Sequence, residues 1–216
     1  MRAVLLGSIG VLAETSEVQR AAFNAAFADH GLGWQWSQAE YREMLGRSGG
    51  QARVAAYAQA RGVAVDAGAV HRRKSALFRE MLAAQPPGLR PGVSATLDGA
   101  RARGLPVALV TATAPENVAA LLAAVGVPEG VFDTVVHAGR IGRGKPAPDA
   151  YLRALDDLGL PPAAPLAVED NPDGVAAARA AGVPCLAFPG ALHAGAAFPG
   201  DVPRLSVLDL SAHLAA

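Results

Sequence analysis

The sequence has a single cysteine among its 216 residues, which excludes an intrachain disulfide. Cys185 stands in the apolar run VPCLAF at 183–188, where we expect a small buried side chain. Aromatic residues make up 5% of the chain and charged residues 18%, whereas hydrophobic residues make up 51%. That content is enough for a buried core, and the length suggests one domain, or one core with a smaller insertion.

The chain also lacks an excess of charge of either sign. Nineteen basic and nineteen acidic residues give a formal net charge of zero, so we expect neither nucleic acid nor an anionic membrane as a partner. No apolar run approaches the roughly 18 residues of a membrane span. Two glycines interrupt the apolar stretch near the N-terminus, which disfavours a signal peptide, and a cytoplasmic protein is expected.

The pattern of the chain changes at the PPG breaker at 86–88. Before it, helical periodicity continues from about 16 to 85 without a strand signal, and after it short apolar runs alternate with helical patterns. The expected strands are 3–6, 107–110, 135–136, 166–168 and 185–188. The expected helices are 16–30, 38–45, 51–61, 67–84, 93–103, 115–125, 148–158 and 172–181.

Strands that alternate with helices predict a parallel sheet covered on both faces. We therefore predict an α/β fold with a three-layer core made of residues 1–13 and 88–216. Residues 14–87 would form a helical cap inserted after the first strand. Open parallel sheets bind ligands at the carboxyl ends of their strands, so the cap is expected to cover that edge.

Polar residues follow three of the expected strands. Thr111 in VTAT can hold a phosphate at a helix N-terminus or simply cap that helix. Lys145 in GRGKPAPD suits a phosphate oxygen or a carboxylate, although a solvated lysine is the alternative. Glu169 and Asp170 in AVEDNPDG offer hard oxygen ligands for Mg²⁺, unless Asp170 or Asn171 serves as a helix cap.

Together these loops resemble the motifs of the haloacid dehalogenase superfamily, in the branch of beta-phosphoglucomutase and phosphoglycolate-phosphatase-like enzymes. The stretch EDNPDGVAAA at 169–178 is the most specific part of a likeness that covers nearly the whole chain. The resemblance implies a Rossmannoid core with an inserted helical cap and a hydrolase or phosphomutase that acts on a small phosphorylated metabolite. It also implies phosphate binding by Thr111 and Lys145.

The first motif of the family is degenerate in this sequence. Its nucleophilic aspartate falls on Gly7 and its acid/base aspartate on Ile9, so neither position can attack phosphorus or exchange a proton. Ser8 and Glu14 stand near these positions, but strand alternation should turn Ser8 away from the site. Glu14 would serve only if its loop folds back.

The resemblance places the metal-binding residues at Glu169 and Asp170, together with the backbone carbonyl of Ile9. Because the carboxylate at Gly7 is lost, we expect Mg²⁺ to bind weakly or not at all. Lys145 loses a carboxylate partner as well, so it would pair with Asp170 or bind an anion.

Two cationic residues of the expected cap fall where relatives place substrate-reading loops. Arg47 and Lys74 would contact a phosphate or hydroxyl group of the substrate. The alternative is that both are solvated surface charges.

Three functions remain open at this stage. The first is a catalytically degenerate protein that keeps a phosphate pocket. The second is an active phosphohydrolase with a non-standard nucleophile. The third is a structural or regulatory protein without a ligand, and the sequence leaves any protein partner unidentified. The retention of Thr111, Lys145, Glu169 and Asp170 favours the first two.

Overall fold

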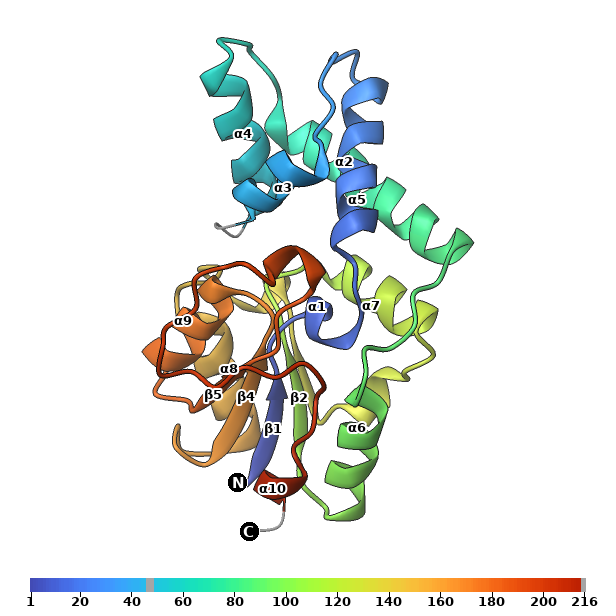
Figure 1. The fold of residues 1–216 in the computed structure, drawn as a ribbon. Coiled ribbons are helices and arrows are strands. Elements are labelled where there is room, and N and C mark those ends of the chain that lie inside the picture. Colours follow the sequence, from blue (N-terminus) through green and yellow to red (C-terminus); the bar gives the residue numbers. More distant parts are fainter. Residues whose placement is uncertain (46–48, 215–216) are drawn as a thin grey trace.

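The centre of the molecule is a sheet of five parallel strands in the order β3-β2-β1-β4-β5 (Figure 1). The computed structural model describes residues 1–45 and 49–214. The strands are β1 (Ala3–Leu6), β2 (Val107–Val110), β3 (Thr134–Val136), β4 (Pro165–Glu169) and β5 (Cys185–Ala187). Each lies within one residue of its predicted bounds, and the predicted α/β fold with a parallel sheet is confirmed.

Helices cover both faces of this sheet. Val4 and Leu6 of β1 pack in one apolar cluster with α6 and α7, whereas Leu5 packs on the other face with α8 and α9, as strand alternation requires. The helices are α1 (Ile9–Leu12), α2 (Ser16–Asp29), α3 (Gln38–Met44), α4 (Gly50–Ala60), α5 (Ala67–Ala84), α6 (Val93–Ala102), α7 (Pro115–Ala124), α8 (Asp149–Leu158), α9 (Pro172–Ala180) and α10 (Ser211–Leu214). Short 3₁₀ turns are η1 (Glu129–Val131), η2 (Ala138–Arg140) and η3 (Ala191–His193).

Local sequence signals explain where several of these helices begin and end. Pro115 opens α7 and Pro172 opens α9, where a missing N–H costs nothing. The Asn171 side chain accepts the Gly174 N–H at 2.9 Å and caps α9, as the sequence predicted. Gly159 ends α8 with φ +61°, a left-handed conformation that favours glycine.

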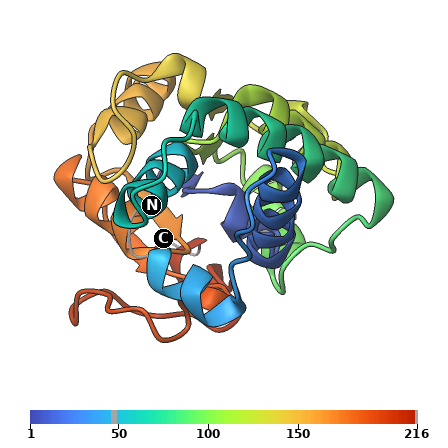
Figure 2. The ribbon, with the colours of Figure 1, turned by 90° about the horizontal axis from the view of Figure 1, so that it is seen from above.

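The segment between β1 and α6 is helical where it is described. Helices α2 to α5 lie above the carboxyl edge of the sheet, and α2 and α5 lie side by side (Figures 1 and 2). The apolar cluster on the α7 face of the sheet continues into this layer through Phe23, Phe27, Phe78 and Leu82. A cap with bounds at 14 and 87 stays a prediction.

Two features were not expected from the sequence. Residues 9–12 form the short helix α1 directly after β1, with Ser8 as its N-cap. Near the C-terminus, Arg204 forms an isolated parallel bridge with Ala187 at the edge of the sheet. The first of these features reshapes the loop that carries the degenerate motif.

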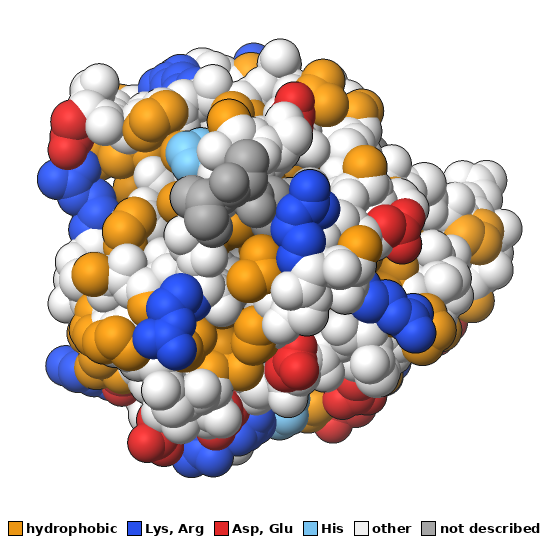
Figure 3. Space-filling view, turned by 90° about the horizontal axis from the view of Figure 1, so that it is seen from below, with side chains coloured by type: hydrophobic (Ala, Val, Ile, Leu, Met, Phe, Trp, Pro, Cys, Tyr) orange, Lys and Arg blue, Asp and Glu red, His pale blue; other side chains and the backbone are white. Residues whose placement is uncertain are grey.

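The surface at the opposite end of the strands shows no gathering of one charge. Seen from below, acidic and basic side chains are scattered among hydrophobic and polar ones (Figure 3). Within residues 1–45 and 49–214, no helix combines the length and the apolar character that crossing a bilayer requires.

Candidate functional site

Loops that follow the strands meet at the carboxyl edge of the sheet and line a pocket of about 360 Å³ beneath the helical layer. Thr111 comes from the end of β2, Lys145 from the segment after β3, and Asp170 from the end of β4. All three line the pocket, and Lys74 of α5 lines it from the opposite side. The fold therefore brings four of the residues singled out in the sequence to one cavity.

The space beside Gly7 is filled by another side chain. A Cβ at Gly7 would overlap the carboxyl group of Glu169 and would lie 2.5 Å from the Tyr151 hydroxyl. Tyr151 donates to Glu169 Oε1 at 2.7 Å. Lys145 Nζ donates to the same carboxyl oxygen, to the Gly7 carbonyl and, at 2.8 Å, to the Val110 carbonyl. The glycine is thus surrounded by a compact polar cluster.

The partner of Lys145 corrects one expectation from the sequence. Lys145 forms an ion pair with Glu169 and not with Asp170. Glu169 is the last residue of β4 and shares a face with Ala167, which packs toward α8 and α9, whereas Asp170 has already left the strand. Gly7, two residues after Leu5, lies on that same side of the sheet, so strand alternation brings Lys145, Gly7 and Glu169 together.

Glu169 is a fully buried carboxyl group with 0% exposure. Burial raises its pKa to about 7, and the neighbouring Lys145 opposes the rise. Its Oε2 is buried without a hydrogen-bond partner in the described part of the chain. The Glu169 carboxyl therefore depends on Lys145 and Tyr151 for compensation of its desolvation.

The position of Ser8 corrects a second expectation. Its hydroxyl lines the pocket and donates to Asp170 Oδ1 at 2.8 Å, while it accepts the N–H groups of Gly10 and Val11 at 3.0 and 3.3 Å. Alternation fails here because β1 ends at Leu6 and Ser8 already caps α1. Ser8 therefore points into the site.

Asp170 is held from several sides. Besides Ser8, the Asn171 side-chain amide donates to its Oδ1 at 2.7 Å. A Cβ at Gly10 would overlap Asp170 Oδ2, so only a glycine allows this close approach. The carboxylate is 8% exposed and reaches the pocket.

Glu14 is engaged away from these groups. Its Oε1 lies 3.3 Å from Arg90 Nε and accepts the Ala191 N–H at 3.2 Å. Glu14 does not belong to the described residues that line the pocket. Glu14 therefore does not lie where it could replace the carboxylate that Gly7 lacks.

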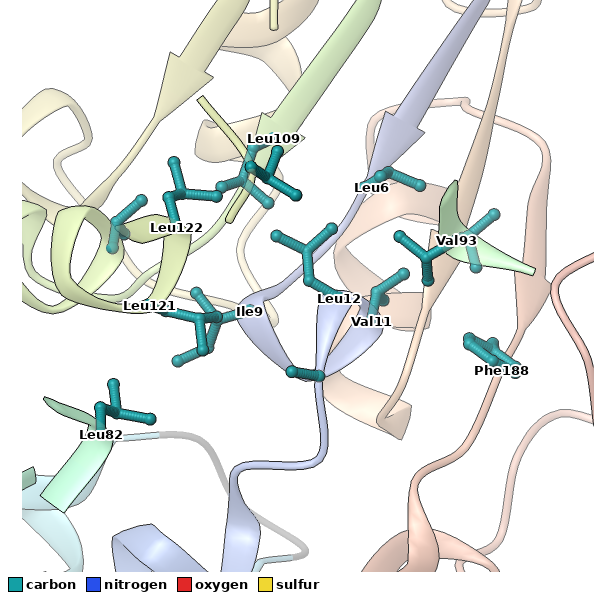
Figure 4. Close-up of a cluster of buried hydrophobic side chains, with 14 of the residues drawn as sticks. Leu6, Ile9, Val11, Leu12, Leu82, Val93, Leu109, Leu121, Leu122 and Phe188 are labelled. Atoms are coloured by element: carbon teal, nitrogen blue, oxygen red, sulfur yellow. The ribbon is translucent and has the colours of Figure 1, made fainter. Parts of the chain in front are cut away.

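Ile9 is 5% exposed and belongs to the apolar cluster that runs from the sheet to the helical layer. Its side chain lies near Leu121 and Leu122 of α7 and Leu82 of α5 (Figure 4). It borders the pocket as well. An apolar contact between the two layers thus occupies the position where the sequence motif has its acid/base group.

Thr111 is 2% exposed, and its hydroxyl exchanges hydrogen bonds with Thr113 rather than capping a helix. The Thr111 hydroxyl donates to Thr113 Oγ1 at 3.0 Å and accepts the Thr113 N–H at 3.1 Å. The N-cap of α7 is Ala114, which has no side-chain capping bond. The positive end of the α7 dipole therefore lies close to a hydroxyl that borders the pocket, an arrangement suited to anions.

Lys74 is the cation on the far side of the pocket and is 4% exposed. Its Nζ donates to Gln19 Oε1 at 3.0 Å and lies over the rings of Phe23 and Phe78. Burial lowers the pKa of Lys74 to about 7, with a further contribution from Arg53. The solvated surface charge considered as its alternative does not fit this burial. Arg47 lies outside the described residues.

Three further pocket residues, Arg53, His71 and His193, were missed by the sequence analysis. Burial, Lys74 and Arg53 together lower the pKa of His71 to about 4. The three-residue spacing of His71 and Lys74 on one helix was a signal that they share a face. His193 had no such signal, because its segment has no periodic pattern.

Comparison with known proteins places this geometry in a family. The model of the haloacid dehalogenase-like hydrolases matches residues 1–182. The chain belongs to this family.

The relatives of the chain include proteins that act on phosphorylated carbohydrates. Protein CbbY of Rhodobacter capsulatus is 43% identical over 188 residues, which cover 85% of this chain and 83% of that protein. Hexitol phosphatase A of Escherichia coli is 37% identical over 123 residues, covering 57% of this chain and 52% of the enzyme. The likeness to CbbY extends over most of the chain, whereas that to the hexitol phosphatase extends over little more than half of it.

Two crystal structures of CbbY from Rhodobacter sphaeroides resemble the present fold. The complex with phosphate has a TM-score of 0.93 and 34% identity and covers 100% of both chains. A mutant in complex with xylulose-(1,5)bisphosphate has a TM-score of 0.90 and 35% identity, and covers 96% of this chain and 94% of that one.

The metal site that the family resemblance implies does not fit the side chains present. No group of three or more histidine, cysteine or acidic side chains able to hold a metal occurs in the described ranges. Gly7 offers no carboxylate, and Glu169 is bound to Lys145 and Tyr151 instead of facing the pocket with Asp170. Asp170, already hydrogen-bonded to Ser8 and Asn171, is the one carboxylate of the expected set that borders the pocket in the described part of the chain.

Proposed function

We propose that this haloacid dehalogenase-like protein binds a small phosphorylated carbohydrate and does not hydrolyse it. The observation that carries the proposal is the first motif. Gly7 has no reactive group and the Glu169 carboxyl lies in the space beside it, while Ile9 packs in an apolar cluster. Loss of a nucleophile lowers rates by on the order of 10⁴ to 10⁶ in enzymes where it has been measured.

The pocket retains groups suited to an anion. Thr111 and Lys145 border it on the core side and Lys74 on the cap side. Asp170 is the acidic side chain among its described lining residues, and its Oδ1 already accepts hydrogen bonds from Ser8 and Asn171. Without the two aspartates of the motif, repulsion of a phosphate is reduced.

Two places for negative charge favour a ligand with two phosphate groups. The N-terminus of α7, at Thr113 and Ala114, borders the pocket on the core side, whereas Lys74 lies across the pocket on α5 without an ion-pair partner in the described ranges. The CbbY relatives were crystallised with phosphate and with a sugar bisphosphate. These observations support xylulose 1,5-bisphosphate as the first probe to test.

Calorimetry should detect binding of this bisphosphate, and of inorganic phosphate more weakly, with affinities that added MgCl₂ leaves unchanged. No phosphate should be released above the background of a buffer control. Lys74→Met should weaken bisphosphate binding, whereas Arg72→Met on the exposed side of the same helix should not. Absence of binding to wild type would overturn the proposal.

The affinity should depend on pH through Lys74. Because its pKa is lowered to about 7, Lys74 is mostly neutral at pH 8, and a bound phosphate favours its charged form. Binding at pH 8 should therefore take up protons, and affinity should fall as pH rises from 7 to 9. His71, with a pKa of about 4, stays neutral throughout.

Proton uptake is measured by calorimetry in buffers of different ionisation enthalpy. Lys74→Met should abolish most of the uptake, with Arg72→Met as the matched control. Unchanged uptake in Lys74→Met would assign the proton to another group.

A second function, hydrolysis through a different nucleophile, is favoured by one contact. The Ser8 hydroxyl lies in the pocket and donates to Asp170, so Asp170 would accept the Ser8 proton as Ser8 Oγ bonds to phosphorus. The P–O bond to the sugar would break as the sugar oxygen takes up that proton, and water would then cleave the phosphoserine to release phosphate and regenerate Ser8. Both amides of Gly10 and Val11, however, already donate to this oxygen. Phosphate release that disappears in Ser8→Ala would establish this activity.

A further inference from the structure

His193 borders the pocket from the one strand end to which the resemblance assigns no role. The loops after β1, β2, β3 and β4 carry the family motifs, whereas η3 after β5 carries His193. The carboxyl ends of parallel strands meet at one edge. The fifth strand thus delivers a side chain to the same cavity as the other four.

The imidazole of His193 is buried and incompletely paired. The residue is 8% exposed, and its Nδ1 has no hydrogen-bond partner within the described residues. A buried ring nitrogen without a partner is unfavourable, because it has lost water and gained nothing in return. Because His193 lines the pocket, a turn of the ring would bring this nitrogen to a group bound there, which would supply the missing partner.

The loop that carries His193 is firmly held. Arg90, itself 8% exposed, donates to the carbonyls of Phe188 at 2.9 Å and Pro189 at 2.8 Å. Glu14 accepts the N–H of Ala191, and the His193 N–H donates to the Gly190 carbonyl at 2.9 Å. A fixed backbone holds the imidazole in one place, as a specific contact requires.

We propose that His193 contacts the ligand and hydrogen-bonds an oxygen of its carbohydrate part. The inference rests on the proposed function. Thr111 follows β2, on one side of β1, whereas His193 follows β5, beyond β4 on the other side. A phosphate held at Thr111 and the N-terminus of α7 is therefore separated from His193 by the width of the site, and the rest of the ligand extends toward the imidazole.

The test compares two probes on three variants of the full chain. His193→Leu removes the ring nitrogen, His193→Asn keeps a polar atom near the position of Nδ1, and His213→Leu changes an exposed histidine as a control. Binding of inorganic phosphate and of xylulose 1,5-bisphosphate is measured by calorimetry, and thermal unfolding checks that each variant is folded.

His193→Leu should bind the bisphosphate about tenfold more weakly, which is the size of one lost hydrogen bond, and should bind inorganic phosphate as wild type does. His193→Asn should recover most of the affinity, and His213→Leu should match wild type.

Three results would overturn the role of His193. If His193→Leu keeps the bisphosphate affinity, or if both probes weaken equally, the imidazole is not a contact to the carbohydrate, although the proposed function stands. If wild type binds neither probe, the proposed function and the role of His193 fail together.

Discussion

Lys145→Met is expected to lower the free energy of unfolding by about 3–5 kcal/mol at pH 7.5, since the buried Glu169 carboxyl group must then either hold an uncompensated charge or take up a proton well above its unfolded-state pKa. Glu169 is fully buried, and Lys145 is its ion-pair partner. Tyr151 alone would then donate to the carboxyl group. Urea denaturation followed by circular dichroism measures the change.

Two comparisons separate this effect from a general loss of packing. Adding Glu169→Gln to Lys145→Met should recover most of the stability, because the amide carries no charge and its oxygen still accepts from Tyr151. Arg143→Met, which removes an exposed ion pair with Asp149, should leave the stability unchanged. A double variant no more stable than Lys145→Met would contradict the argument.

The difference in the free energy of unfolding between Lys145→Met and wild type should also be smaller at pH 5. The folded-state pKa of Glu169 is raised to about 7 by burial, above its ordinary value. A group whose pKa is raised on folding stabilises the folded state fully at pH values below its unfolded-state pKa. This stabilisation is lost as the pH rises through the folded-state pKa. Without Lys145 the folded-state pKa of Glu169 rises further. At pH 5 the carboxyl group therefore stays protonated, and no buried charge destabilises the folded variant.

The architecture could be predicted from the sequence because its local signals agree with one another. Pro115, Asn171 and Gly159 mark helix ends, and β1 and β2 are unbroken apolar runs that are buried throughout. Helix periodicity and strand length then fix the order of elements. Residues 189–210 lack such periodicity, which is why the bridge of Arg204 was not predicted.

The site was predicted less completely because its details depend on side-chain pairing. Motif spacing brought Thr111, Lys145 and Asp170 to one edge, but it did not reveal that Lys145 pairs with Glu169. Ser8 was assigned to the wrong side because a strand rule was applied two residues beyond the end of β1, where Ser8 already caps α1. Sequence periodicity ends where the backbone turns, and that is where binding residues gather.

A glycine at position 7 has a consequence for any attempt to restore the family chemistry. Because the Glu169 carboxyl lies where a Cβ would stand, Gly7→Asp requires Glu169 to turn away from Lys145. The new carboxylate would then compete for the lysine. A gain of Mg²⁺ affinity in Gly7→Asp/Ile9→Asp therefore also requires Glu169 to move.

Ile9→Asp is expected to lower the free energy of unfolding by about 3–5 kcal/mol, so the same double variant must first fold. The substitution removes an apolar side chain from the cluster that also holds Leu82, Leu121 and Leu122 and puts a carboxylate in its place. The matched control is Ile9→Val, which should cost about 1 kcal/mol because only one methylene is lost.

The comparison of these two variants at pH 5 and pH 8 decides where the side chain of Ile9 points. A carboxyl group in the apolar cluster has a raised pKa, so the stability of Ile9→Asp should fall as pH rises through that value, while Ile9→Val should show the wild-type pH profile. If Ile9→Asp matches Ile9→Val at pH 8, the side chain faces the solvent of the pocket. An aspartate could then be restored at the acid/base position, because the apolar contact between α1, α5 and α7 would not disfavour its charge.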